Sequence, residues 1–177
     1  MIKTLILGMV TSTFTVNSYY FDKPSDIINW SENYKLKYTD FKGVQKKDKN
    51  KPQGEIAINI SWTAKIEKDI PKYVISNKFD KSKSWLTINH SELIKEYQFI
   101  WNLQELYIRK ARKQISDLNN LNESNEDLYL NVIKSNIKKF QKEKNRYSGI
   151  LQNQPDFYRI LDKKYQDSIN LYANYKQ

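Results

Sequence analysis

The chain has 177 residues, with 30 Lys and Arg against 20 Asp and Glu, no cysteine and a single histidine. The absence of cysteine excludes disulfides and cysteine nucleophiles, and one histidine without a G-x-S-x-G motif gives little basis for a serine triad. The formal charge of +10 suits an anionic partner. However, the lysines are interleaved with acids, so no specific nucleic-acid partner is predicted.

Residues 1–18, MIKTLILGMVTSTFTVNS, have the plan of a secretory signal peptide. Lys3 supplies a positive start, an apolar stretch follows, and Val16–Ser18 offers modest side chains to a signal peptidase. We therefore expect a secreted or periplasmic protein whose mature part, residues 19–177, forms a single domain. The alternative is that residues 1–18 form a buried first strand or helix. No later stretch approaches the roughly 20 apolar residues that span a bilayer, so no transmembrane segment is expected after removal of the signal.

Three stretches of the mature part are expected to form strands. Tyr34–Tyr38 is predicted as a short strand in a segment that ends at Gly43. In Glu55–Ile66 apolar residues occupy every second position, which is the pattern of a strand with one buried face. Tyr73–Phe79 is predicted to pair with it as a hairpin, through a longish loop that contains Pro71. The apolar face is made of Ile56, Ile58, Ile60, Trp62, Ala64 and Ile66.

The most basic stretch, KGVQKKDKNKPQG at 42–54, lies between the first two predicted strands. Its Gly, Pro and Asn residues favour a solvated loop whose lysines serve solubility. The alternative is a basic surface that binds anionic polymers. Its candidate residues are Lys46, Lys47, Lys49 and Lys51.

From Leu93 onward the apolar residues recur at intervals of three and four, which predicts a core-facing helix over about 90–118. Asn89 and Glu92 are expected to cap its first turn. His90 is expected to cap or to hydrogen-bond near the helix start rather than to take part in chemistry.

Two further helices are expected after a polar connector. The second covers about 127–144, and Pro155, a residue favoured in a first helical turn, begins a third at about 155–175. The third is expected to bury Phe157, Ile160, Leu161, Tyr165, Ile169 and Tyr172. Strands come first and helices after, without β-α-β alternation. The pattern predicts an α+β fold, with N-terminal antiparallel strands followed by a long helix and two further C-terminal helices.

The long helix has the setting of a zinc site. Exported zinc hydrolases commonly carry H-E-x-x-H on an amphipathic helix, because positions four apart face the same way and two imidazoles can hold one ion. Four segments carry a resemblance to a known family: WSENYKLKYTDFKG at 30–43, VISNKFDKSKSWL at 74–86, LIK at 93–95 and ELYIRKARK at 105–113. They resemble the DUF922 family of secreted bacterial proteins, which are regarded as zinc-dependent proteases. The resemblance extends from about Ile27 to Lys113 and implies a zincin-like helix with zinc as cofactor.

The chain departs from that family where the chemistry would lie. With the flanking segments in register, Glu96 stands at the first histidine, Tyr97 at the glutamate and Ile100 at the second histidine. Ile100 has no donor atom, and Tyr97 cannot serve as a carboxylate base because an ordinary tyrosine has a pKa of about 10. We therefore predict no catalytic residue, no bound metal and no cofactor. His90 and Glu96 are weak candidate ligands, and Glu105 points away from Glu96 on a continuous helix.

These patterns favour an exported, catalytically inactive relative of a zinc-metallopeptidase-like family that acts by binding a protein or a cell-envelope partner. One alternative is an active secreted hydrolase with a non-standard site near His90 and Glu96. Another is the basic surface protein described above. A further alternative is an ordinary core helix whose likeness to the family is accidental. Trp30, Trp85 and Trp101 are expected in the core, although aromatic side chains could also supply binding contacts.

Overall fold

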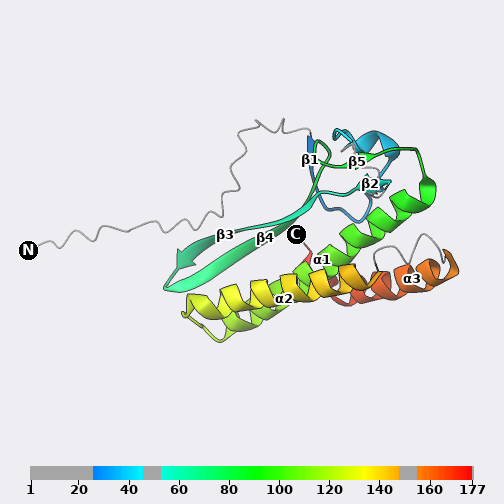
Figure 1. The fold of residues 1–177 in the computed structure, drawn as a ribbon. Coiled ribbons are helices and arrows are strands. Elements are labelled where there is room, and N and C mark those ends of the chain that lie inside the picture. The colour runs from blue at the N-terminus through cyan, green and yellow to red at the C-terminus, as the bar shows by residue number, and fades with distance from the viewer. Residues whose placement is uncertain (1–25, 46–52, 148–154, 177) are drawn as a thin grey trace, which may run out of the picture.

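The computed structural model describes residues 26–45, 53–147 and 155–176. It has the predicted α+β architecture, with antiparallel strands followed by three helices, of which the first is the longest. Figure 1 shows a long hairpin that extends from the end of the molecule where the short strands gather and runs along the helices. The elements are β1 (Ile27–Asn29), η2 (Tyr38–Asp40), β2 (Gly54–Glu55), β3 (Ile58–Glu67), β4 (Ile70–Asp80), β5 (Trp85–Leu86), α1 (Ser91–Asn120), α2 (Glu126–Tyr147), α3 (Pro155–Leu171) and η4 (Ala173–Tyr175).

The hairpin of β3 and β4 confirms the period-two prediction, with two corrections. The pairing runs without interruption to Glu67 opposite Ile70, so a two-residue turn, Lys68 and Asp69, joins the strands. Both turn residues have positive φ, 52° and 63°, as the tight hairpin turn that matches strand twist requires. The expected longish loop is therefore wrong, and Pro71 lies within β4.

The two strands of the hairpin are buried to different extents. Ile75 and Phe79 of β4 are buried, whereas Trp62, directly opposite Ile75, and Ile66 of β3 are exposed. Directly opposite residues of an antiparallel pair share a face, so Ile58, Ile60 and Trp62 do share the face of Phe79 and Ile75. The predicted strand from Glu55 is broken, however, because β2 pairs with β5 and β3 pairs with β4.

The predicted strand at Tyr34–Tyr38 is wrong. The first strand is β1, which pairs with the end of β4, and residues 31–40 form turns and the short η2 helix. Side chains satisfy the backbone here: the Leu36 N–H donates to the Gln98 side-chain carbonyl at 2.8 Å, and the Lys37 N–H donates to Asp40 at 2.9 Å. A strand partner is therefore not needed.

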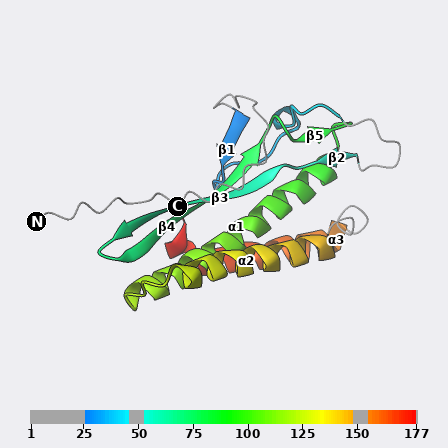
Figure 2. The same cartoon turned by 60° about the vertical axis from the view of Figure 1, so that its left-hand side comes forward.

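The three helices form a layer beneath the hairpin, as both views show (Figure 2). The predicted ranges hold within a few residues, and α3 begins at Pro155 as expected. His90 is the N-cap of α1, so the expected cap by Asn89 and Glu92 is wrong. Phe157 and Ile160 were expected in the core, but both are exposed because α3 packs through its next turns instead.

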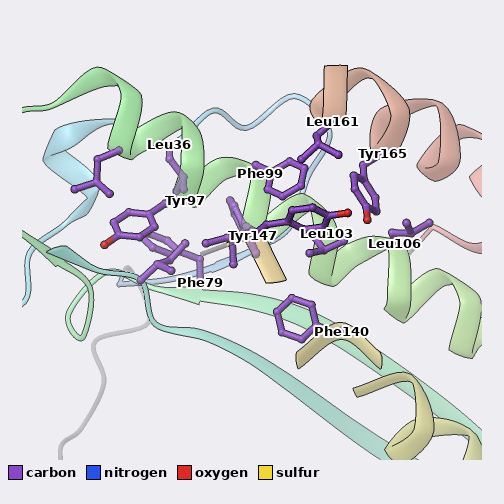
Figure 3. Packing of buried hydrophobic residues seen from close by; sticks show 14 of the residues in the cluster. Leu36, Phe79, Tyr97, Phe99, Leu103, Leu106, Phe140, Tyr147, Leu161 and Tyr165 are labelled. Atoms are coloured by element: carbon purple, nitrogen blue, oxygen red, sulfur yellow. The ribbon is translucent and has the colours of Figure 1, made fainter. Parts of the chain in front are cut away.

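The main core lies between β4, α1, α2 and α3. Figure 3 shows Phe99 and Leu103 of α1 facing Tyr165 of α3 and Tyr147 of α2. Of the tryptophans, Trp85 and Trp101 are buried as predicted, while Trp30 is half-buried against the core. The fold thus fixes α1 as the central helix, in contact with every other layer.

Candidate functional site

Positions 96, 97 and 100, where the predicted resemblance would place a zinc motif, lie in the packed interior. Tyr97 and Ile100 are 7% and 3% exposed, and Glu96 is buried beside them. Burial raises the pKa of the Tyr97 hydroxyl, and the negative charges of Glu96 and Glu55 raise it further. The phenol is therefore neutral at physiological pH.

Carbon surrounds the Tyr97 ring on several sides. The ring lies 5.7 Å from that of Phe41, centroid to centroid, and Figure 3 places it beside Leu36 and Phe79. On the strand side it meets Gly54, where an added Cβ would lie 3.1 Å from the Tyr97 hydroxyl and 2.5 Å from the Leu86 side chain. Well-packed side chains thus surround the Tyr97 ring.

His90 closes the N-terminus of α1. Its Nδ1 accepts a hydrogen bond from the Leu93 N–H at 3.3 Å, which satisfies one of the unpaired donors of the first turn. The predicted capping role is confirmed. Glu96 lies six residues further, about 9 Å along the helix axis and about 120° around it, so the structure does not bring the two weak candidate ligands together. Within the described ranges, no three His, Cys, Asp or Glu side chains form a group that could hold a metal ion.

Two other predictions lie outside the described residues. These are the signal peptide at residues 1–18 and the candidate basic surface of Lys46, Lys47, Lys49 and Lys51. They stay predictions. Of the helices in the described part of the chain, none is both long and apolar enough to cross a membrane.

α1 also carries a polar stripe that was not predicted from the sequence. Its members are separated by four, three, four and three residues, so they lie along one side of the helix. The prediction considered only the apolar residues at core spacing, although polar residues at the same spacing carry an equal signal. The stripe consists of Gln98, Asn102, Glu105, Arg109 and Arg112.

Glu105 is the centre of a buried charged cluster, which we define as Asn77, Glu105, Arg109 and Arg112. Its Oε1 accepts from Arg109 Nε at 3.1 Å and from Arg112 Nη1 at 3.0 Å, and its Oε2 accepts from the Asn77 amide at 3.2 Å. The indole N–H of Trp101 orients Asn77 by donating to its carbonyl oxygen at 3.0 Å. One carboxylate therefore faces two guanidinium groups, and the cluster carries a net positive charge.

Arg109 is only 1% exposed, although it is charged. Its Nε donates to Glu105, its Nη1 donates to the Ile169 carbonyl at 3.1 Å, and its guanidinium carbon lies 5.1 Å from the ring centroid of Trp30. Its Nη2 finds no hydrogen-bond acceptor in the part of the chain that the structure describes. Buried donors are rarely left without a partner, so this one calls for an explanation.

Arg112 links three parts of the fold. Its Nε and Nη2 donate to the Ile75 carbonyl of β4, at 3.2 and 2.7 Å, and its Nη1 donates to the Tyr175 carbonyl of η4 at 2.9 Å. Burial lowers the pKa of Arg112 while Glu105 favours its charged form, and a guanidinium stays protonated. The C-terminal segment is thereby fixed beside the charged cluster.

The segment that begins at Trp30 lies against the same stripe. The Trp30 indole N–H donates to the Asn102 carbonyl oxygen at 3.0 Å, and the Gln98 amide donates to that same oxygen at 3.0 Å. Gln98 in turn accepts from the Leu36 N–H. Helix side chains thus position Trp30 over Arg109.

A cavity of about 300 Å³ lies between this segment, the charged cluster and the C-terminal end of the described chain. We call it the Trp30 cavity. Its charged lining consists of two carboxylates and three cations, which leaves one positive charge in excess. The charged residues are Glu32, Glu105, Arg109, Arg112 and Lys176.

The chain was also compared with known proteins. No protein family, no characterised protein and no solved structure matches it.

Proposed function

We propose that this chain is an exported binding protein that has the scaffold of a DUF922-like zinc peptidase but performs no metal-dependent hydrolysis. The observation that carries the proposal is the packing of Tyr97 and Ile100, which stand where such a peptidase would have its glutamate and its second histidine. Both side chains are part of the core.

The chemistry of hydrolysis supports the same conclusion. A catalytic zinc takes about three protein ligands and keeps an open position for water, which a carboxylate base can activate. Ile100 offers no lone pair, and a buried neutral phenol at position 97 is a poor base near pH 7. The lone pair of His90 Nδ1 is already engaged in capping α1.

The resemblance to the family differs between two parts of α1, and this difference favours a binding function. The part that departs from the family pattern, Glu96–Ile100, is packed core. The part that keeps it, Glu105–Lys113, supplies three of the four residues of the charged cluster. A scaffold that lost its metal ligands and kept a charged cavity is suited to binding a ligand.

Metal analysis of the full-length protein purified from its expressing cells tests the proposal. We expect zinc far below one atom per chain, both in the native protein and in His90→Ala, and no peptide hydrolysis that zinc addition restores. One zinc atom per chain that is lost in His90→Ala would instead support the hydrolase with a site near His90 and Glu96.

Export is tested separately, by sequencing the N-terminus of the protein recovered from each cell fraction. We expect a mature protein that begins after Ser18 and is recovered outside the cytoplasm. A cytoplasmic protein that retains residues 1–18 would contradict this part of the proposal.

A further inference from the structure

We infer that the Trp30 cavity is a binding site for a single carboxylate group, whose oxygen accepts a hydrogen bond from Arg109 Nη2. The carboxylate belongs to a small organic acid or to the C-terminus of a peptide. This inference names the ligand class of the binding function proposed above. The two can fail separately, because zinc content tests one and carboxylate binding tests the other.

Arg109 is held by several contacts. Two of its nitrogens are already engaged, with Glu105 and with the Ile169 carbonyl, and its guanidinium carbon lies over the Trp30 ring. The guanidinium is therefore held in one orientation, with one nitrogen, Nη2, left without an acceptor. Because Nη2 is also shielded from solvent, a ligand in the cavity reaches it through a small shift of the side chains around it.

The charge that lines the cavity also favours a singly charged ligand. The carboxylate of Glu105 is satisfied by Asn77, Arg109 and Arg112, so it does not compete for the remaining donor. Lys176 and Glu32 also line the cavity, so the lining has one cation in excess. A ligand with one negative charge balances it, whereas a doubly charged phosphate would also meet Glu32.

The size of the cavity and the composition of its walls also fit a small carboxylate ligand. About 300 Å³ is at the lower end of cavities that hold small molecules, and is enough for a few residues of a peptide end. The Trp30 ring offers an apolar surface, and Ser31 and Asn33 offer neutral polar groups. A hydrogen bond from a guanidinium to a carboxylate is also charge-assisted, which makes it stronger than one between neutral groups.

The position of Trp30 provides a signal for binding. Its ring covers the guanidinium of Arg109, so a ligand that reaches Nη2 must change the surroundings of the indole. Intrinsic fluorescence can report this, although the chain has four tryptophans. A Trp30→Phe variant identifies the part of the fluorescence change that comes from Trp30.

The experiment titrates the full-length protein with N-acetyl-dialanine at constant ionic strength, by calorimetry and by fluorescence. The same dipeptide with an amidated C-terminus, sodium acetate and sodium phosphate serve as comparison probes. We expect the free acid to bind once per chain, at least about tenfold more tightly than the amide, because a charge-assisted hydrogen bond is lost in the amide. Acetate binding as tightly as the dipeptide acid would identify a small organic acid as the ligand, and weaker acetate binding would identify a peptide end.

Two variants and one control variant keep the test independent of Arg109, which is too deeply built into the fold to be replaced safely. Lys176→Gln, at the rim, should weaken acid binding by about two- to fivefold, as loss of an exposed charge does. Lys95→Gln, at the far end of α1 in an exposed ion pair with Glu92, is the matched control and should not change it. Trp30→Phe should abolish the fluorescence change while calorimetric binding weakens by less than about tenfold.

Three results would overturn the inference. The amide or phosphate could bind as tightly as the acid, Lys176→Gln could behave like Lys95→Gln, or the fluorescence change could persist in Trp30→Phe. Each would show that no carboxylate is recognised in the Trp30 cavity, and none of them would bear on the zinc content.

Discussion

The two halves of α1, divided at Glu105, bury their residues by different means. In the first half, Tyr97 and Ile100 fill the interior with carbon, and Glu96 is a buried carboxylate beside them. In the second half, which begins at Glu105, Glu105 and Arg109 pair opposite charges in the interior, at 2% and 1% exposure. The same helix thus contains a closed core and, two to three turns later, a charged wall of a cavity.

The difference indicates where function is to be sought. Apolar side chains in a core are stabilised by packing contacts, so they leave no polar group for a ligand to bind. A buried charged cluster has a high desolvation cost, and it is retained only when partners or ligands offset that cost. Arg109, whose Nη2 has no acceptor in the described part of the chain, lies in the second half and lines the Trp30 cavity, so that cavity is where a ligand is to be sought.

The largest expected effect comes from breaking the charged half. Glu105→Ala leaves Arg109 and Arg112 buried without their shared carboxylate, so the free energy of unfolding should fall by about 3–5 kcal/mol in urea denaturation. Asp167→Ala, which breaks an exposed ion pair with Lys163 on α3, is the matched control and should cost about 1 kcal/mol or less. Equal losses in the two variants would mean that the buried cluster contributes no more to stability than an exposed ion pair.

A smaller loss is expected when a histidine is introduced into the carbon-filled half. Ile100→His exchanges a packed hydrocarbon for a polar imidazole in the core, which should cost about 1–3 kcal/mol in the same denaturation experiment. Zinc at millimolar concentration should not raise the midpoint of thermal unfolding. Ile160→His, on an exposed face of α3, is the control and should lie within about 0.5 kcal/mol of the parent protein. Strong stabilisation of Ile100→His by zinc would show that the ligand geometry survives.

The cap at the start of α1 should contribute less. His90→Ala removes the acceptor for the Leu93 N–H and should lower the free energy of unfolding by about 1 kcal/mol. His90→Asn supplies another capping acceptor and should recover most of that loss. If both variants lose the same stability, His90 does more than cap the helix.

The smallest effect is confined to alkaline pH. The folded protein keeps the Tyr97 phenol neutral because its pKa is raised, whereas the unfolded chain ionises it near the ordinary pKa of about 10. The stability from this group is therefore fully present below about pH 10 and is lost as the pH rises further. Tyr97→Phe should lose less stability between about pH 9 and 10.5 than the parent does, while Tyr38→Phe, on an exposed side chain, is the control. Identical pH slopes for the parent and Tyr97→Phe would contradict a buried phenol.

Local patterns in the sequence were sufficient to predict α1 and the hairpin. The three-and-four spacing after Leu93 and the alternation from Ile58 involve only residues that are close in the sequence. The structure contains the helix and the strand that these patterns predict. The hairpin turn was missed because Lys68-Asp69 lacks the glycine that usually marks two positive φ values. The strand expected at Tyr34–Tyr38 failed because Gln98, 62 positions from Leu36, satisfies the backbone there.

The charged cluster could be predicted only in part. The spacing of Glu105, Arg109 and Arg112 puts them on one side of a helix, and this was available from the sequence. Their partners could not be predicted from the sequence. Asn77 lies on β4, 28 positions from Glu105, and the Ile169 carbonyl lies on α3, 60 positions from Arg109. Burial of charge depends on those long-range contacts, which no local pattern encodes.

One calorimetric experiment tests the central claim most directly, by titrating the same sample of full-length protein with zinc chloride and then with N-acetyl-dialanine. If α1 holds a closed core in its first half and a carboxylate site in its second, the dipeptide acid produces a heat of binding. The zinc titration then shows no binding that saturates at one zinc per chain. Stoichiometric zinc binding, with no response to the acid, would contradict the account.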